Sequence, residues 1–199
     1  MTRATRFLEI EDRRSYIITR GRLRELLGMT QGCRPDDLMF TLGPFGKPRL
    51  TTPLAQGAVP FFNLSRTKEH SIIALSWNRE IGVDIENIAL SKHTDDIAVH
   101  FFHPLEREYL QLLSAEQRDR AFVRLWVRKE ALAKAMGTGL NMDLSAHDLT
   151  KIDEPIECPA VVIGNSPFTT RWKIHDLSTP SGICAALASA ETPPSLSPI

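Results

Sequence analysis

The sequence predicts an α/β (α+β) protein of two similar lobes, each a small, mainly antiparallel sheet packed on helices. A segment with helical periodicity precedes a two-strand pattern in the first half, and the same order recurs in the second half. The 199 residues are 42% hydrophobic, enough to bury a core or two packed lobes. We place the N-terminal lobe at residues 1–88, the C-terminal lobe at 89–190, and a disordered Pro- and Ser-rich tail at 191–199.

The first half contains one predicted helix and one predicted hairpin. Apolar residues recur at helical spacing over 15–28, with Gly28 as a plausible C-cap. A loop rich in Gly and Pro follows at 43–60. Residues 71–77 and 81–86 are then expected to pair as a hairpin around the turn Asn78-Arg79-Glu80.

The second half begins with a helical region and ends with two strands. Its apolar residues follow helical spacing until a Gly-Thr-Gly sequence interrupts the pattern, and β-rich segments come later. Helices are expected at 95–102, 104–113 and 115–136, and strands at 171–177 and 182–188.

Composition excludes several classes of protein. The 24 basic and 24 acidic residues balance, so nothing in the totals favours nucleic acid or an anionic membrane as a partner. Cys33, Cys158 and Cys184 are widely spaced and odd in number, which argues against a disulfide framework or a zinc site. The N-terminus has no apolar signal region, and no stretch approaches the ~18 apolar residues of a membrane span. We therefore expect a cytoplasmic protein.

The sequence GVDIE, Gly82 to Glu86, places two carboxylates on one face of a strand. With a rise of ~3.3 Å per residue, Asp84 and Glu86 project about 7 Å apart. Like charges at this distance repel unless a cation lies between or near them, and Gly82 leaves room beside them for a ligand. The alternative is an ordinary solvated strand face that carries two acids.

The helical sequence FVRLWVRKEALAKAMGTGL, from Phe122 to Leu140, carries the second candidate cluster. Lys129 falls within the apolar stripe of the helix, so its ammonium must reach solvent or meet an anion. Glu130 and Lys134 lie one turn apart beside the stripe. The alternative is a surface salt bridge between these two residues, worth about 0.2–0.5 kcal/mol.

Two weaker motifs precede these clusters. GPFGKP presents Lys47 on a constrained loop, and FFNLSRT ends in the donor side chains of Ser65, Arg66 and Thr67. In the order GKP, FNLS, GVDIE and WxxKEAxxKxxG, the motifs together resemble the 4′-phosphopantetheinyl transferases, in particular the surfactin-synthetase-activating, pseudodimeric type. The resemblance covers roughly Arg13 to Leu149. It implies two lobes related by a pseudo-twofold axis, with the active site in the cleft between them.

The resemblance also implies a metal site and catalytic groups. Asp84, Glu86 and Glu130 match the magnesium ligands of the family, and such hard oxygen ligands suit Mg²⁺, with Mn²⁺ as an alternative. Glu130 is also the candidate to accept a proton, directly or through water. Lys134 matches the group that stabilises or protonates the leaving phosphate. Glu106 matches an acidic position close to the reacting phosphate.

Further positions match contacts to coenzyme A. Trp126, Lys129 and Lys134 match residues that line the coenzyme cleft, with the lysines near the pyrophosphate. Lys47 and Ser65 match coenzyme-contacting positions.

This chain departs from the family pattern in two places. Where the family reads NLSHS, Arg66 and Thr67 stand in place of the histidine and serine, so Arg66 becomes the candidate phosphate contact. The N-terminus is short and lacks lysines that some members carry, which leaves Arg13 or Arg14 as the candidate for the 3′-phosphate.

The implied reaction is a magnesium-assisted transfer of 4′-phosphopantetheine from coenzyme A to a serine hydroxyl of an apo acyl or peptidyl carrier protein. It releases adenosine 3′,5′-bisphosphate. The expected partner is an acidic, helical carrier of fatty-acid, polyketide or nonribosomal peptide synthesis, and the enzyme is expected to be a monomer. Two alternatives are a metal-dependent phosphohydrolase on the same site and a non-catalytic carrier-protein-binding homologue.

Overall fold

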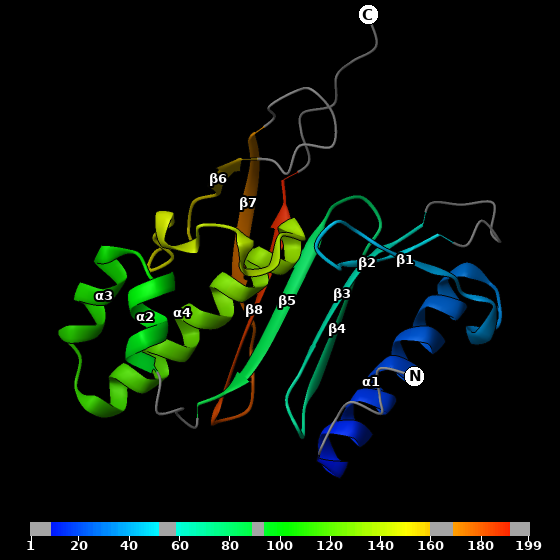
Figure 1. The fold of residues 1–199 in the computed structure, drawn as a ribbon, viewed down its shortest axis with the longest axis horizontal. Coiled ribbons are helices and arrows are strands. Elements are labelled where there is room, and N and C mark those ends of the chain that lie inside the picture. The colour runs from blue at the N-terminus through cyan, green and yellow to red at the C-terminus, as the bar shows by residue number, and fades with distance from the viewer. Residues whose placement is uncertain (1–8, 52–58, 89–93, 160–168, 192–199) are drawn as a thin grey trace, which may run out of the picture.

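The computed structural model describes residues 9–51, 59–88, 94–159 and 169–191 (Figure 1). It confirms a mixed α/β fold of small antiparallel sheets packed on helices. The helices are α1 (Ile10–Gln31), α2 (Thr94–Phe101), α3 (Pro104–Gln111) and α4 (Ala115–Met136), and the strands are β1 (Phe40–Leu42), β2 (Pro48–Leu50), β3 (Phe61–Arg66), β4 (Ser71–Ser76), β5 (Ile81–Asn87), β6 (Ile156–Pro159), β7 (Thr169–Asp176) and β8 (Ile183–Ala190). The bounds expected for α2, α3, α4, β7 and β8 are confirmed to within two residues.

The described strands form three antiparallel sheets. β1 pairs with β2, β3 pairs with β4, and the four-stranded sheet has the order β5-β8-β7-β6. In Figure 1, α1 lies beside β3 and β4, whereas α4 crosses the face of β5 and β8. β5 therefore lies between the two halves of the molecule.

The hairpin expected between 71–77 and 81–86 is wrong. β4 pairs instead with β3 across the turn after Arg66, in a register that sets Arg66 opposite Ser71. β5 pairs with β8, with Asp84 opposite Ala186. The short turn at 78–80 does not determine the pairing of β5, because tertiary packing favours β8 as its partner. The first five residues of β5 are buried, and the small side chains of β8 let the two strands fit closely.

Helix α1 is longer than the periodicity indicates, and its C-cap is Gly32 instead of Gly28. Gly32 has φ 62°, the left-handed conformation typical of a C-cap. Gly28 is buried inside the helix, and a Cβ there would lie 2.8 Å from the carbonyl oxygen of Cys33. The glycine therefore permits a close approach of the following loop and does not end the helix.

Helix α4 carries functional residues on a well-defined scaffold. Ser114 and Gln117 form a capping box at its start, and Gly137, with φ 73°, ends it. The helix packs so closely on β5 that a Cβ added to Gly82 would overlap backbone atoms of Ala131 and Ala135. This contact sets α4 and β5 at a short, fixed separation.

Buried apolar side chains form two main clusters among the described residues. One lies in the C-terminal half between α4 and the four-stranded sheet, and the other joins α1 to the β1–β4 region. No helix in the described parts of the chain is long and apolar enough to cross a membrane. The expected tail from residue 192 onward and the expected junction at 89–93 lie outside the described residues.

Candidate functional site

Asp84 is a buried acid at the junction of β5, β3 and α4. Only 2% of its surface is exposed. Its Oδ1 accepts hydrogen bonds from Ser65 Oγ at 2.7 Å and from Lys134 Nζ at 2.5 Å. Its Oδ2 is also buried and has no hydrogen-bond partner among the described residues. A buried carboxylate oxygen without a partner is costly, and a bound cation would remove that cost.

The charge of Asp84 acts on two further carboxylates, those of Glu130 and Glu86. Burial raises the pKa of Glu130, and the negative charge of Asp84 raises it further while Lys134 opposes the shift. Glu86 is exposed at the end of β5, yet loss of hydration at its carboxylate and the charges of Asp84 and Glu130 raise its pKa to about 7. The structure therefore brings together Asp84, Glu86 and Glu130 with one lysine among them.

The carboxylates of this cluster are ligands that suit a hard cation, although they do not converge in a geometry that would coordinate one. In the described parts of the chain, no group of three or more His, Cys, Asp or Glu residues is arranged to hold a metal ion. The ammonium of Lys134 offsets part of the negative charge instead. The fit to a divalent cation rests on the unpartnered Oδ2 of Asp84 and on the raised pKa values of Glu86 and Glu130, which burial and, second to it, the charge of Asp84 produce.

Positive groups gather next to this cluster around Tyr16 of α1. The guanidinium carbons of Arg20 and Arg66 lie 5.6 and 5.8 Å from the centre of the Tyr16 ring. Arg66 also lies 3.9 Å from Asp12. The Nε of Arg20 is buried without a hydrogen-bond partner among the described residues. Such an arrangement favours an anionic ligand with several acceptor oxygens.

Two hollows open beside these charges. One of about 550 Å³ is lined by Ser65, Arg66, Glu86, Lys134 and neighbouring residues of α1 and β3. A smaller one of about 230 Å³ is lined by Arg20, the Gly46–Pro48 loop, residues of β3 and Lys134. Lys134 lines both hollows, so a ligand could extend from one to the other past its ammonium.

Comparison with known proteins assigns the chain to a family. Residues 80–188 match the model of the 4′-phosphopantetheinyl transferase superfamily. A 4′-phosphopantetheinyl transferase of Bacillus subtilis is 30% identical over 186 residues, covering 91% of this chain and 78% of that protein. This chain belongs to the 4′-phosphopantetheinyl transferase superfamily.

Other members are similar over part of their length. The 4′-phosphopantetheinyl transferase HetI of Nostoc is 36% identical over 140 residues, which cover 70% of this chain and 59% of HetI. With a relative from Synechocystis the match covers 58% of the relative, so the chain spans about three fifths of these two proteins. The solved holo-(acyl-carrier-protein) synthase of Bacillus anthracis, in complex with CoA, has a TM-score of 0.41 and 17% identity. The match covers 57% of this chain and 96% of that one.

In this member of the superfamily, Lys129 and Glu106 lie apart from the cluster around Asp84. Both are fully buried and form an ion pair at 2.8 Å. The remaining donors of Lys129 reach the carbonyls of Leu144 and His147, and Glu106 accepts from the backbone of Leu149 and caps α3. Of the two alternatives expected for Lys129, reaching solvent or meeting an anion, the structure shows the second. Because all of these groups are occupied, neither side chain is available to a phosphate in this geometry.

Three further residues that were expected to contact coenzyme A make contacts elsewhere or lie exposed in the structure. Lys47 donates to Glu80, to Ile81 O and to Ala135 O at 2.8–3.0 Å, which occupies its three donors. Trp126 packs edge-on against Phe101 at 5.6 Å. Arg14 is exposed on α1.

Arg20 is the residue that sequence reasoning missed. The sequence pattern predicts a helix from Ser15 onward, which makes Arg13 and Arg14 the cations ahead of it. The helix instead starts at Ile10 and carries Arg20 further along, one turn after Tyr16. The i, i+4 spacing of Tyr16 and Arg20 is the signal that could have identified it.

Proposed function

We propose that this member of the superfamily transfers the 4′-phosphopantetheine group of coenzyme A to a serine hydroxyl of an apo acyl or peptidyl carrier protein. The reaction releases adenosine 3′,5′-bisphosphate. The observation that carries the proposal is the meeting of Asp84, Glu86, Glu130 and Lys134 beside two hollows lined with basic groups. Carboxylates and cations in one cleft are the groups that position and neutralise a transferring phosphate.

Asp84, Glu86 and Glu130 would hold the Mg²⁺ ion, with Mn²⁺ as an alternative. The cation, when bound, supplies positive charge to the reacting pyrophosphate. The unused Oδ2 of Asp84 supports this assignment, as do the raised pKa values of the two glutamates. Ser65 holds Asp84 in place through its 2.7 Å hydrogen bond.

Arg20, Arg66 and Lys134 are the proposed contacts to the phosphates of coenzyme A. Arg20 replaces Arg14 as the candidate for the nucleotide end, because its Nε lacks a partner and it lines the smaller hollow. Arg66 faces the larger hollow, where the usual family histidine would stand. Lys134 lies between them and would donate to the leaving phosphate.

Glu130 is the proposed acceptor of the serine proton, directly or through water. Burial and the charge of Asp84 raise its pKa above the ordinary glutamate value. A base is more effective as its pKa approaches the working pH. All of these groups belong to one chain, so we propose that the enzyme acts as a monomer.

The direct test is incubation with coenzyme A, Mg²⁺ and a panel of apo carrier proteins, with intact mass as the readout. We expect a gain of one phosphopantetheine group on at least one carrier. Glu130→Gln should lower the rate by roughly 100-fold or more. Glu116→Gln, an exposed glutamate in the first turn of the same helix, is the matched control and should leave the rate unchanged.

Other outcomes would assign the chain differently. Consumption of coenzyme A without any carrier protein would indicate the metal-dependent phosphohydrolase. Tight binding of a carrier with no gain in mass would indicate a non-catalytic carrier-binding homologue.

Metal binding has its own readout. In metal-free buffer, Glu130→Gln should raise the Tm because it removes one of three repelling carboxylates. Addition of Mg²⁺ should raise the Tm of the wild type more than that of the variant, since a ligand stabilises the form that binds it. Equal Mg²⁺-induced shifts in both proteins would contradict the assignment of Glu130 as a ligand.

A further inference from the structure

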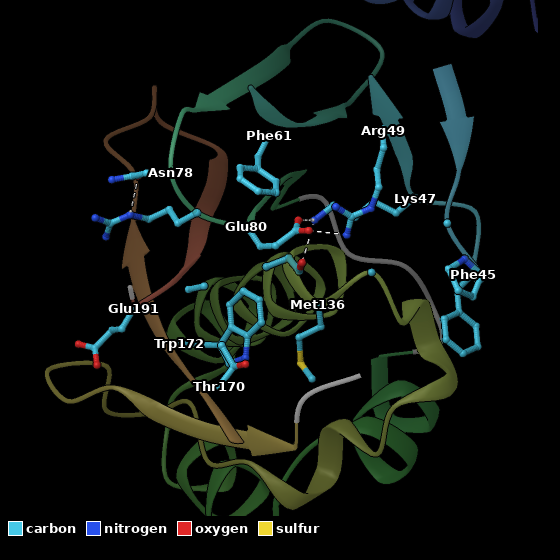
Figure 2. Close-up of a pocket in the computed structure, with 16 residues that line it drawn as sticks. Phe45, Lys47, Arg49, Phe61, Asn78, Glu80, Met136, Thr170, Trp172 and Glu191 are labelled. Carbon is cyan, nitrogen blue, oxygen red and sulfur yellow. Dashed lines mark hydrogen bonds and ion pairs between the residues drawn. The ribbon is translucent and has the colours of Figure 1, made fainter. Parts of the chain in front are cut away.

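The N-terminal half meets strand β5 without backbone pairing. Among the described strands, β3 pairs with β4 and β5 pairs with β8. Side chains bond the edge of β5 that faces the N-terminal half. Lys47 of the β1–β2 loop donates to Ile81 O at 3.0 Å, and Figure 2 shows its side chain beside Glu80. Asn63 of β3 accepts from Val83 N, also at 3.0 Å.

The contact between Asn63 and Val83 is buried. Asn63 is 8% exposed and Val83 is 0% exposed. A buried backbone N–H normally has a partner, and β3 and β5 share no backbone hydrogen bonds among the described residues. Only the side-chain oxygen of asparagine can accept, so the bond to Val83 also fixes which way the amide group faces. The proposed transferase reaction gives Asn63 no role.

The next residues of β3 belong to the proposed coenzyme A site. Ser65, two residues after Asn63, projects from the same face of the strand and donates to Asp84 Oδ1 at 2.7 Å. Arg66 follows and lines the larger hollow. Asn63 itself lines the smaller hollow. The bond to Val83 therefore holds against β5 the part of β3 that carries these residues.

The proposed contacts to the phosphates come from both halves of the molecule. Arg20 and Arg66 lie on α1 and β3, whereas Lys134 lies on α4. A ligand that touches all three binds best at one relative placement of β3 and β5, because a misplacement of about 1 Å weakens such contacts severely. The three proposed metal ligands all lie on β5 and α4, which the close approach at Gly82 holds together.

We propose that Asn63 is a positioning residue for coenzyme A binding. Its side-chain oxygen holds β3 against β5 and so sets Arg66 at the distance from Lys134 that the phosphates require. The inference rests on the proposed function, because it takes coenzyme A as the ligand of the two hollows. Loss of the acceptor at Asn63 is therefore expected to weaken coenzyme A binding and to leave metal binding intact.

The test compares Asn63→Leu with the wild type as full chains. Leucine has as many side-chain heavy atoms as asparagine and the same branching, but no acceptor for Val83 N–H. Two dissociation constants are measured without a carrier protein. The Kd of coenzyme A is measured by calorimetry in Mg²⁺ buffer, and the Kd of Mn²⁺ alone from the EPR signal of the free ion. A merely structural role would lower the Tm and leave both constants unchanged.

Asn63→Leu should raise the Kd of coenzyme A roughly 10-fold or more and leave the Kd of Mn²⁺ within about threefold of the wild type. In a ¹⁵N spectrum, the amide proton of Val83 should move upfield because it loses its acceptor.

Thr19→Val is the matched control in the N-terminal half. Thr19 is 2% exposed, and its hydroxyl lies 2.7 Å from that of Ser71, which joins α1 to β4. The change removes a buried hydrogen bond away from β5. It should lower the Tm and leave both dissociation constants and the Val83 amide signal as in the wild type.

A Kd of coenzyme A within about twofold of the wild type in Asn63→Leu would overturn the proposal, as would an equal rise in Thr19→Val. Weaker Mn²⁺ binding with unchanged coenzyme A binding would also overturn it, because Asn63 would then act on the metal ligands. If Asn63→Leu does not fold, Asn63→Ser, whose hydroxyl is too short to reach Val83 N, carries the same expectations. Failure of the wild type to bind coenzyme A would contradict the proposed function, and this inference with it.

Discussion

At the scale of single residues, the negative charges of Asp84, Glu86 and Glu130 repel one another. Ser65 and Lys134 hold one oxygen of Asp84, and the other oxygen has no partner. Burial raises the pKa values of Glu86 and Glu130, and the charge of Asp84 raises them further. A cluster of this kind is expected to lower the stability of the metal-free protein and to gain stability when a cation binds.

Glu86 should make the metal-free protein less stable as pH rises. Its pKa is about 7 in the folded protein, against an ordinary value of 4.5, so folding favours the protonated acid. The stabilising contribution is complete below the unfolded pKa and is lost as pH rises through about 7. We therefore expect Glu86→Gln to reduce the loss of Tm between pH 5.5 and pH 8, measured by thermal unfolding in EDTA.

The exposed Glu69 provides the control for this measurement. Glu69→Gln should leave the pH dependence as in the wild type. If Glu86→Gln and the wild type lose the same Tm over this range, the raised pKa of Glu86 is wrong.

Arg66 should contribute to coenzyme A binding. Its side chain is 18% exposed and is held near Asp12 and the Tyr16 ring, so little freedom remains to be lost when a phosphate binds. Arg66→Ala should weaken the binding free energy of coenzyme A by roughly 1.5–3 kcal/mol, the range for a hydrogen bond to a charged group. This loss corresponds to a rise of about 10- to 150-fold in the KM for coenzyme A. Steady-state kinetics at pH 6 and pH 8 would measure it.

Substitutions at Arg66 separate charge from shape. Arg66→Lys should rescue part of the loss equally at both pH values, whereas Arg66→His should rescue more at pH 6, because histidine is protonated there. A KM for Arg66→Ala within twofold of the wild type, together with a pH-dependent loss in His70→Ala, would move the phosphate contact to His70.

At the scale of elements, the contact between α4 and β5 positions the proposed active site. Asp84 and Glu86 lie on the strand, whereas Glu130 and Lys134 lie on the helix. Their separation depends on how closely the two backbones approach. Gly82 permits this approach because it has no side chain between them.

Gly82→Ala should destabilise the protein strongly. A Cβ at this position would overlap the carbonyl oxygen of Ala131 and the amide nitrogen of Ala135, and backbone atoms cannot rotate away. We expect a loss of about 3 kcal/mol or more in the free energy of unfolding, at the upper end of overpacking effects. Urea unfolding would measure it.

Gly21→Ala is the matched control within α1. Gly21 is exposed, and a Cβ there meets nothing within 4 Å. Because alanine favours helix more than glycine does, this change should stabilise by up to about 1 kcal/mol. A loss for Gly82→Ala no greater than about 1 kcal/mol would show that α4 and β5 can separate without difficulty.

At the scale of the whole molecule, two apolar clusters lie on either side of the β5 region. We propose that they are the cores of two lobes. The expected lobe boundary at residue 88 assigns β5 to the N-terminal lobe. The hydrogen bonds of β5, however, join it to β8 of the C-terminal half. Val83 N of β5 also donates to the side chain of Asn63 on β3, so this strand links both halves.

Lys47 should stabilise the junction of the two halves more than it contributes to coenzyme binding. Its ammonium joins the β1–β2 loop to Glu80, to the start of β5 and to the end of α4. Lys47→Met should lower the free energy of unfolding by about 2–4 kcal/mol, because the partly buried carboxylate of Glu80 and two carbonyl oxygens lose their donor. The KM for coenzyme A should remain within about twofold.

An exposed lysine provides the comparison. Lys68 pairs with Glu9 at the surface, so Lys68→Met should leave the free energy of unfolding almost unchanged. A large rise in the KM of Lys47→Met without loss of stability would restore the coenzyme contact that the family resemblance implies.

Local pattern determined much of this protein from the sequence alone. The bounds of α4 were predicted to the residue, because its apolar stripe, the capping residue Ser114 and the terminating Gly137 all act within a few residues of chain. The i, i+2 spacing of Asp84 and Glu86 indicated two carboxylates on one face of a strand. These signals survive in a single sequence because they are short-range, whereas Glu130 was joined to the two acids only through the family resemblance.

Only the tertiary structure decided which groups meet over long distances. Hydrogen bonding could have joined β5 to β4, and burial against β8 and α4 decided otherwise. Lys129 and Lys47 both resembled phosphate ligands, yet Glu106 and Glu80 occupy them. An ammonium pairs with whichever acceptor the packed fold brings within about 3 Å, and a buried charge cannot remain unpaired. Spacing along the chain does not contain that information.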